Sequence, residues 1–441
     1  MTDIKQLETA ADTKGLRRVA IDPLTRVEGH GKVTLLLDEQ NHIRQARLHI
    51  SEFRGFEKFI QGRPYWEAPV LVQRLCGICP VSHHLAAAKA LDQLVGVNEL
   101  SPTAEKMRRL MHLGQTLQSH ALHFFHLASP DLLFGYDDTV AHRNIMGVLA
   151  DYPDIAKQGV LLRKYGQEVI RLTAGKRIHG TGAIPGGINK NLSHTERSFL
   201  REDISQITAW AQAALELAIR LFEEAPDNQG FATNPTNMLS LVGDGGQFDL
   251  YHGRLRLKQA DGSLYFDDVD YRDYENVIRE QIKSWTYMKF PYIQPLGPEQ
   301  GSYRVGPLAR DNCDTFPTPL AEAARKAFRA AAGGELMQAT LAYHWARMIE
   351  LLHCAEAIGQ LLEDPDLSGT ELVRKGEMQQ KGIGVIEAPR GTLFHHCHWP
   401  WPSRSGYRQW HWLWHPAGYR QRASSGVRPQ RDGWRFPPGR C

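Results

Sequence analysis

Apolar residues near the start of the chain alternate with polar ones in two short runs and then adopt a helical spacing. The runs VTLLL (33–37) and IRQARLHI (43–50) flank the turn-prone DEQN (38–41), a pattern that predicts a β-hairpin. From Glu67 to Val95 the apolar positions recur at helical spacing, so one continuous helix is expected there. The chain therefore begins with a small β element and continues into helices.

Capping signals predict further helices. Ser101, followed by proline, is a favourable N-cap, and Ser193 with a glutamate three residues later forms a capping box before a long apolar stripe. Helical spacing returns between residues 320 and 362, with a break expected at Gly333-Gly334, while residues 239–268 form a second β-rich patch. The pattern predicts a mainly α fold with small peripheral β patches.

Composition places the chain among globular proteins. It has 441 residues, of which 42% are hydrophobic and 23% charged. It contains no apolar run of about 18 residues and no apolar block at its start, so we expect neither a membrane span nor a secretory signal. In the cytoplasm, the expected compartment, six cysteines are thiols or metal ligands more often than disulfides. Residues 1–17 are polar, and we expect them to be flexible.

The last 45 residues differ from the rest. Residues 397–441 hold eight arginines and one aspartate, a charge of +7, which leaves −4 for residues 1–396 and no sign of nucleic-acid binding there. The same segment contains six of the ten tryptophans but one leucine, one valine and no isoleucine, so it cannot form an ordinary core. This composition is typical of a nucleotide sequence translated out of frame. A genuine disordered basic tail is the alternative, although six tryptophans are unusual for disorder.

The most specific chemical motif is RLCGICPVSHH (74–84). On a helix, Cys76, Cys79 and His83 share one face, where two thiolates can chelate a soft metal ion and a histidine can ligate it or hydrogen-bond a sulfur. A structural zinc knuckle and a thioredoxin-like redox pair are the alternatives. Zinc usually needs a second pair of ligands, and a thioredoxin motif follows a strand. The spacing therefore favours a metal site whose remaining ligands lie elsewhere.

Four motifs, in order along the chain, together closely resemble the large subunit of nickel–iron hydrogenases. Two further stretches resemble the cytoplasmic, bidirectional, NAD-linked branch of that family. The resemblance covers residues 18–396, and four motifs in order are far more specific than any one of them. The motifs are TRVEGHGKV (25–33), FRGFEKF (53–59), RLCGICPVSHH (74–84) and EAPRGTLFHH (387–396), and the further stretches are LQSHALHFFHLASPDLL (117–133) and RIHGTGAIPGGIN (177–189).

The resemblance implies a nickel–iron centre held by the cysteine pair. Cys76 matches a terminal nickel ligand, and Cys79 matches a ligand that bridges nickel and iron, whose other ligands include carbon monoxide and cyanide. His83 matches the histidine that hydrogen-bonds the bridging sulfur. Glu57 matches a ligand of a structural magnesium ion, a hard cation that prefers oxygen donors. Without the family, His83 is an ordinary helix-face histidine and Glu57 an acid at a helix start.

Glu28 and Arg390 are the catalytic residues that the resemblance implies. Glu28 matches the glutamate that exchanges protons with a terminal nickel thiolate, since heterolytic cleavage of H₂ releases a proton that a nearby carboxylate can carry away. Arg390 matches the arginine over the open face of the metals, where its charge can polarise H₂. Many relatives brace this arginine with an aspartate near Gln118 and Ser119, and neither residue supplies that charge. Taken alone, Glu28 is a surface charge and Arg390 a turn residue.

The chain departs from the family at its C-terminal end. The family closes with a second Cys-x-x-Cys pair and a histidine, whereas the match here stops at His396. Cys397 and Cys441 are 44 residues apart and cannot form that pair. The family holds its centre with four thiolates, of which this sequence supplies two. Cys313 and Cys354 have no partner nearby in sequence, and we expect both to be buried thiols.

The sequence thus predicts the catalytic large subunit of an NAD-linked nickel–iron hydrogenase that acts on H₂ and protons. Electrons are expected to pass first to a small iron–sulfur subunit, then to a diaphorase module that binds flavin and NAD. One alternative is a subunit that docks its partner without a complete metal site. Another is the quinone-site subunit of respiratory NADH dehydrogenases, which generally lacks the cysteine pair. We expect Cys76 and Cys79 near the centre of a helical core, close to Glu28 and Arg390.

Overall fold

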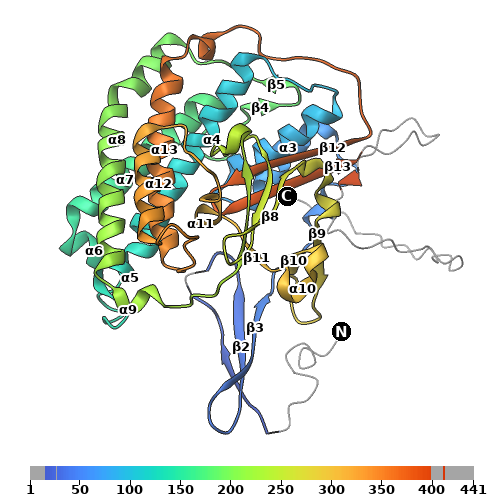
Figure 1. Cartoon of the computed structure of the whole chain (residues 1–441). Coiled ribbons are helices and arrows are strands. Elements are labelled where there is room, and N and C mark those ends of the chain that lie inside the picture. Colours follow the sequence, from blue (N-terminus) through green and yellow to red (C-terminus); the bar gives the residue numbers. More distant parts are fainter. Residues whose placement is uncertain (1–14, 26, 399–410, 413–441) are drawn as a thin grey trace, which may run out of the picture.

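Long helices form one side of the molecule in the computed structural model, which describes residues 15–25, 27–398 and 411–412 (Figure 1). Their buried faces share one large apolar core. The hydroxyl of Ser101 caps the first of these helices, and Ser193 and Glu196 form the predicted capping box at the third. The helices of this bundle are α4 (Pro102–Leu122), α7 (Pro153–Ala174), α8 (His194–Glu223), α12 (Pro319–Ala331) and α13 (Ala342–Glu363).

Small sheets lie beside the bundle, so the prediction of a mainly α fold with minor β elements is confirmed. The first predicted hairpin is present as β2 and β3, and the second β patch is a four-stranded sheet in the order β11-β6-β7-β8. The hairpin of β12 and β13 was not predicted from the sequence. The strands are β1 (Arg17–Ile21), β2 (Gly31–Leu37), β3 (Ile43–Ile50), β4 (Ala183–Ile184), β5 (Gly187–Ile188), β6 (Asn237–Val242), β7 (Arg254–Lys258), β8 (Leu264–Val269), β9 (Ile278–Ile282), β10 (Lys289–Ile293), β11 (Tyr303–Arg304), β12 (Lys381–Ala388), β13 (Gly391–His398) and β14 (His411–Trp412).

The helix predicted from Glu67 to Val95 is interrupted, so that prediction is wrong. Cys76 has extended backbone angles, and a new helix starts after Cys79 because Pro80 suits a first helical position but cannot continue an earlier helix. The shorter α-helices are α1 (Phe56–Phe59), α2 (Ala68–Leu71), α3 (Pro80–Leu94), α5 (Ser129–Phe134), α6 (Ile145–Asp151), α9 (Pro226–Gln229), α10 (Gly297–Gln300) and α11 (Pro307–Arg310). The single π-helical segment within the described ranges is His123–Ala128. The 3₁₀ segments are Tyr65–Glu67, Val72–Leu75, Asp244–Gly246, Tyr271–Asn276, Gln294–Leu296 and Pro365–Ser368.

Helix α3 lies directly on strand β12, and glycine permits this close contact. A Cβ atom at Gly382 would lie 2.0 Å from the Ala90 carbonyl oxygen, and one at Gly384 would lie 2.0 Å from the Ala86 carbonyl oxygen. The helix therefore contacts the strand backbone with no side chain between them. This contact fixes the start of α3, and so Cys79, relative to the turn between β12 and β13.

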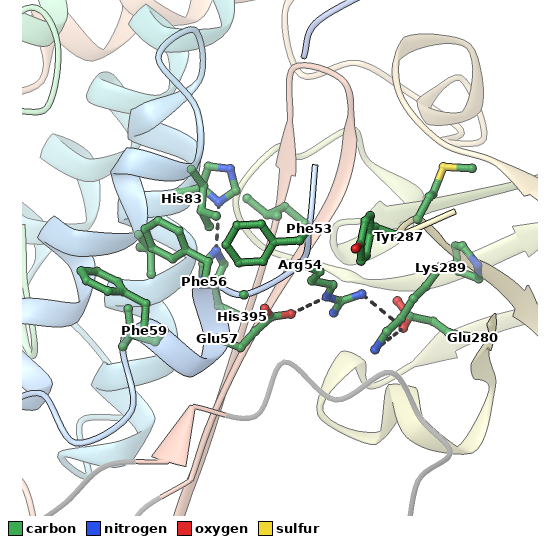
Figure 2. A pocket seen from close by; sticks show the side chains of 17 residues that line it. Phe53, Arg54, Phe56, Glu57, Phe59, His83, Glu280, Tyr287, Lys289 and His395 are labelled. Atoms are coloured by element: carbon green, nitrogen blue, oxygen red, sulfur yellow. Dashed lines mark hydrogen bonds and ion pairs between the residues drawn. The ribbon is translucent and has the colours of Figure 1, made fainter. Parts of the chain in front are cut away.

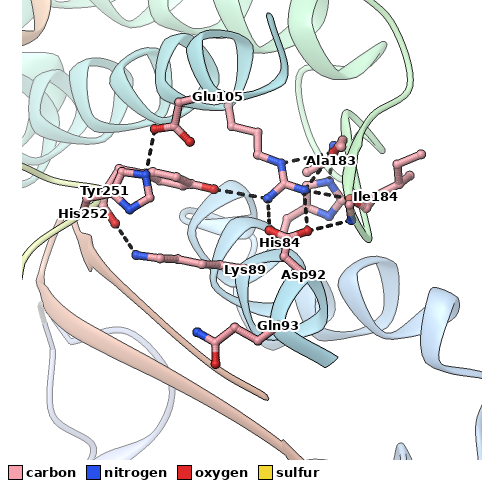
Figure 3. A network of polar contacts seen from close by, with 12 residues as sticks. His84, Lys89, Asp92, Gln93, Glu105, Ala183, Ile184, Tyr251 and His252 are labelled. Carbon is pink, nitrogen blue, oxygen red and sulfur yellow. Dashed lines mark hydrogen bonds and ion pairs between the residues drawn. The ribbon is translucent and has the colours of Figure 1, made fainter. Parts of the chain in front are cut away.

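Buried cations connect α3 to its other neighbours (Figure 3). Arg108 on α4 donates to the two carboxylate oxygens of Asp92 on α3, at 2.6 and 3.0 Å. Lys89 on α3 donates to the backbone oxygens of Tyr251, at 2.5 Å, and of Val385 in β12, at 2.8 Å. Burial lowers the pKa of Lys89 to about 8. Polar contacts thus reinforce the apolar contact that holds α3 in place.

Strand β13 continues two residues past the expected end of the body, to His398, and β14 pairs with its last two residues. The rest of the predicted atypical tail lies outside the described residues, as do residues 1–14 of the N-terminal segment that we expected to be flexible. Within the described part of the chain, no helix has both the length and the apolar character that a membrane crossing requires.

Gly384→Ala is expected to lower the free energy of unfolding by about 1–3 kcal/mol or more, because its methyl group meets the backbone of α3 at a distance that no Cβ tolerates. Gly230→Ala is the matched control, since nothing lies within 4 Å of the added atom. Denaturant unfolding followed by circular dichroism measures both. Equal stability of the two variants would show that the α3–β12 contact can accommodate an added methyl group.

Candidate functional site

Cys76 and Cys79 lie in the loop before α3, where Cys79 is the N-cap residue. The Cys79 thiol donates to the Cys76 sulfur at 2.8 Å, and the Cys79 N–H donates to the same sulfur at 3.2 Å. Both cysteines are half-buried, so the expectation of a pair buried at the centre of the core is wrong. The loop lies at the surface, where the adjacent Leu75 is 46% exposed.

The hydrogen bond between the two thiols makes them chemically different. The Cys79 donor lowers the pKa of Cys76 to about 7, and the same bond raises the pKa of Cys79. Cys76 is therefore the sulfur that ionises first, and Cys79 keeps its proton. Two adjacent sulfurs of this kind are donors suited to a soft metal ion.

Glu28 reaches the cysteine pair from the exposed loop between β1 and β2. The Cys76 thiol donates to Glu28 Oε1 at 3.3 Å across 48 residues of sequence. This contact confirms that Glu28 lies close to the pair. Hydrogen bonds thus run from Cys79 through Cys76 to a carboxylate in contact with solvent.

Arg390 occupies the two-residue loop between β12 and β13, where Ala388 pairs with Gly391. Its Nη1 donates to the Ser119 hydroxyl on α4 at 3.4 Å. Its positive charge acts on the Cys79 thiol and opposes the rise in the pKa of that thiol. The structure therefore places the charge of Arg390 within electrostatic reach of the cysteine pair, in agreement with the prediction. It also shows Ser119 as a hydrogen-bond partner, where the sequence indicated only a missing charge.

His83 lies one turn into α3 and faces a second histidine on β13. His83 Nδ1 and His395 Nε2 are 3.2 Å apart, and burial lowers the pKa of His83 to about 4, so its ring is neutral. The predicted hydrogen bond from His83 to the Cys79 sulfur stays a prediction. No role for His395 was predicted from the sequence, although this residue lies inside the EAPRGTLFHH motif.

A cavity of about 890 Å³ opens beside these histidines and is lined mainly by apolar side chains (Figure 2). At its wall Arg54 lies between two carboxylates, since it donates to Glu57 and lies 3.7 Å from Glu280. These oxygen donors are of the kind that magnesium prefers, but Arg54 already pairs with both carboxylates, and Lys289 Nζ lies 3.7 Å from Glu280. The arrangement does not fit a magnesium ion while Arg54 holds this position, so the role of Glu57 as a ligand stays a prediction.

The three other thiols in the described part of the chain lie apart from the site. Cys313 and Cys354 are buried, as expected, and so is Cys397; burial raises the pKa of all three. Within the described ranges, no three histidine, cysteine or acidic side chains converge as a metal-binding group. The soft-donor chemistry of Cys76 and Cys79 fits a nickel–iron centre, but these two supply half of the thiolates that the family uses.

This helical scaffold, with paired thiols beside a carboxylate and a guanidinium, defines a metal-dependent redox subunit. The sequence pattern described as Nickel-dependent hydrogenase matches residues 54–137, and the one described as HoxL-like matches residues 18–53. The NAD-reducing hydrogenase HoxS subunit beta of Cupriavidus necator is 48% identical over 396 residues, covering 86% of this chain and 81% of that protein. One subunit of the F420-non-reducing hydrogenase of Methanothermobacter thermautotrophicus is 45% identical, covering 86% and 80%. The chain belongs to the family of nickel–iron hydrogenase large subunits, the catalytic subunits of these enzymes.

Solved structures agree with this assignment. An NAD⁺-reducing [NiFe]-hydrogenase in the H₂-reduced state shares 58% identity and a TM-score of 0.85, covering 87% of this chain and 86% of that one. A [NiFeSe]-hydrogenase of Dm. baculatum, at 23% identity and a TM-score of 0.70, shares the fold. The fold is therefore shared by proteins whose sequences differ widely from this one.

Iodoacetamide is expected to alkylate Cys76 of the metal-free chain at a rate that rises with pH through about 7, because the thiolate is the reacting form. Cys79→Ala removes the hydrogen-bond donor and should move this midpoint up towards the ordinary thiol value of about 8.5. Mass spectrometry of the labelled peptides gives the rate for each cysteine, with the buried Cys313 and Cys354 as unreactive internal controls. A midpoint that Cys79→Ala leaves in place would contradict the assigned cause.

Proposed function

We propose that this subunit cleaves H₂ heterolytically, and reduces protons in the reverse direction, within an NAD-linked hydrogenase. The hydrogen-bonded path from Cys79 through Cys76 to Glu28 is the observation that carries the proposal. Similarity to an NAD-reducing subunit over 86% of this chain supports the link to NAD.

Glu28 takes up the proton in this proposal. A proton at the Cys76 sulfur has an acceptor 3.3 Å away in Glu28 Oε1, and the exposed carboxylate exchanges it with water. A carboxylate within one hydrogen bond of the reacting site is the geometry that general acid–base catalysis requires. The same path runs in reverse when protons are reduced.

Cys76 and Cys79 are proposed as two thiolate ligands of the nickel–iron centre, whose iron also carries carbon monoxide and cyanide. When bound, that centre supplies the two-electron chemistry of H₂. Arg390 keeps a fixed positive charge beside Cys79, where it can stabilise negative charge that develops as H₂ is split. His83 is proposed to hydrogen-bond the Cys79 sulfur. Glu57 could bind magnesium only after Arg54 has turned away.

Exposed apolar residues beside the site support the docking of a small iron–sulfur subunit. Phe53, Phe59, Leu75 and Tyr287 line the cavity and are 76%, 51%, 46% and 57% exposed. Exposed apolar groups that gather in one place commonly mark an interaction surface. A partner docked there would lie near the proposed metal ligands and could receive electrons from them. We place the flavin and NAD sites on a diaphorase module of the same complex, in the cytoplasm.

We further propose that the tail beyond His396 is translated out of frame and that the correct frame encodes the second cysteine pair. The tail's excess of tryptophan and arginine and its lack of aliphatic residues support this. The two other frames of the coding DNA past codon 396 provide the test. An aliphatic-rich frame that contains Cys-x-x-Cys is expected, and the absence of that pair from both frames would refute the frame shift.

Glu28→Gln is expected to reduce H₂ oxidation and H/D exchange about 10²-fold or more while nickel content stays unchanged, because glutamine keeps the shape but cannot carry a proton. The measurement uses the complete complex, expressed from a gene whose frame past codon 396 has been verified. Glu52→Gln is the matched control, because Glu52 is an exposed carboxylate that pairs with His30, two residues from Glu28, instead of with Cys76. Normal exchange in Glu28→Gln would remove Glu28 from the mechanism.

Cys79→Ser should fail at an earlier stage, because a hydroxyl is a poor ligand for a soft metal. We expect nickel in the purified complex to fall to background, with H/D exchange lost as a consequence. Cys313→Ser, which changes a buried thiol away from the site, should retain the metal. Full nickel in Cys79→Ser would exclude the pair as metal ligands, and background nickel in the unaltered complex would favour a subunit that docks without a complete centre.

A further inference from the structure

A buried arginine lies behind the turn that carries Arg390. Arg310, at the end of α11, is 1% exposed. It donates to the backbone oxygens of the two residues that precede Arg390, through Nη1 to Ala388 at 2.8 Å and through Nη2 to Pro389 at 3.2 Å. One guanidinium thus binds the carbonyl groups of both residues that directly precede Arg390.

Two buried carboxylates hold this guanidinium in place. Arg310 donates through Nε and Nη2 to the two oxygens of Glu350 on α13, both at 2.6 Å, and through Nη1 to Glu387 at 3.0 Å. The second oxygen of Glu387 accepts from the Thr392 hydroxyl at 2.8 Å, just past the turn. A planar, fully charged fork is suited to so many directed contacts, and a lysine is not.

Close packing leaves the turn little freedom to shift. Gly391 has φ +145°, and a Cβ there would lie 2.3 Å from the Val305 side chain. A Cβ at Gly306 would lie 2.8 Å from the Arg390 carbonyl oxygen. The turn therefore packs closely against residues 305–306, and Arg310 binds its backbone on the buried side.

The ion cluster of Arg310, Glu350 and Glu387 also binds His120, the neighbour of Ser119 in the sequence. His120 Nε2 lies 2.7 Å from Glu350 Oε2, the oxygen that also accepts from Arg310. Burial lowers the pKa of His120 to about 4, so its neutral ring donates to the ionised Glu350. His120 directly follows Ser119, whose hydroxyl meets Arg390 at 3.4 Å. One ion cluster thus fixes both the backbone that carries Arg390 and the helix turn that meets its guanidinium.

We infer that Arg310 is the positioning residue for Arg390: it holds this arginine from behind, through the backbone, at a place where Ser119 offers the side chain a hydroxyl and not a carboxylate. The inference rests on the proposed function only in what Arg390 does once it is in place. The 3.4 Å contact with Ser119 is long for an N–H···O hydrogen bond and has no charge to strengthen it on the hydroxyl side. The short bonds behind the turn therefore carry most of the restraint.

Arg310→Lys tests this in the metal-free chain by hydrogen–deuterium exchange of backbone amides, read by mass spectrometry. Lysine keeps the charge between the two glutamates but cannot reach both carbonyls. We expect residues 388–392 to exchange about 10-fold faster or more, with α3 and α13 unchanged. Arg108→Lys is the matched control, because Arg108 is equally buried, holds Asp92 through both oxygens and donates to the Ile184 and Gly187 carbonyls. It should affect residues 184–187 and leave the 388–392 turn protected.

Unchanged exchange at 388–392 in a folded Arg310→Lys variant, or an equal increase there in Arg108→Lys, would overturn the inference. If Arg310→Lys does not fold, Glu387→Gln decides, because it weakens one anchor of Arg310 with little change in volume. A smaller increase confined to the same residues supports the inference, and no increase overturns it. These measurements need neither nickel nor H₂, so their failure leaves the metal and proton assignments untouched.

A rescue experiment separates positioning from a general effect on stability. In the active complex, Arg310→Lys should lower H/D exchange of H₂ at unchanged nickel content. Adding Ser119→Asp should recover at least about half of the loss, because a carboxylate at that position can pair with the Arg390 guanidinium directly. No recovery in the double variant would indicate that Arg310 only stabilises the fold and would overturn the positioning role.

Discussion

The contact of α3 with β12 is the constraint on which the site depends. The glycines at 382 and 384 let the helix lie on the strand backbone, so the start of α3 and the end of β12 are held in one rigid unit. Cys79 is attached to the first and Arg390 to the second. Glu28 and Ser119 then reach this unit from a surface loop and from α4. A small shift between helix and strand would separate the cysteine pair, which Glu28 contacts, from Arg390, which Ser119 contacts.

Local signals in the sequence predicted the elements whose ends are marked by capping or turn residues. Ser101, Ser193 and the hairpin turn at residues 38–41 each act within a few positions of themselves, and each prediction is confirmed. The prediction of one continuous helix across Cys76 and Cys79 is wrong because the spacing of apolar residues does not reveal a short interruption. Strand β12 was missed because seven of its eight residues are buried, which removes the alternation that identifies a half-exposed strand.

Spacing alone indicated a metal site at Cys76, Cys79 and His83, whereas Glu28, Glu57 and Arg390 were predictable only through the resemblance of whole motifs to a family. Proximity of Glu28 to Cys76 across 48 residues has no local signal. The contacts of His395 with His83, and of Arg310 with the 388–389 carbonyls, arise from tertiary packing between distant elements. The short sequences around these residues, LAR (308–310) and FHH (394–396), give no indication of these contacts. The half-buried position of the cysteine pair likewise depends on where α3 begins in space.

The direction of strand β13 sets the distance that any later part of the chain must span to contact the cysteine pair. It starts beside Arg390 and ends at His398, seven residues further, at a rise that amounts to roughly 23 Å. Cys397 accordingly packs against Leu91 and Leu94, near the far end of α3 from Cys79. Any ligand that the polypeptide supplies to the cysteine pair from beyond His398 must travel back along the whole strand. Spanning that distance takes about seven residues of extended chain or about 15 residues of helix.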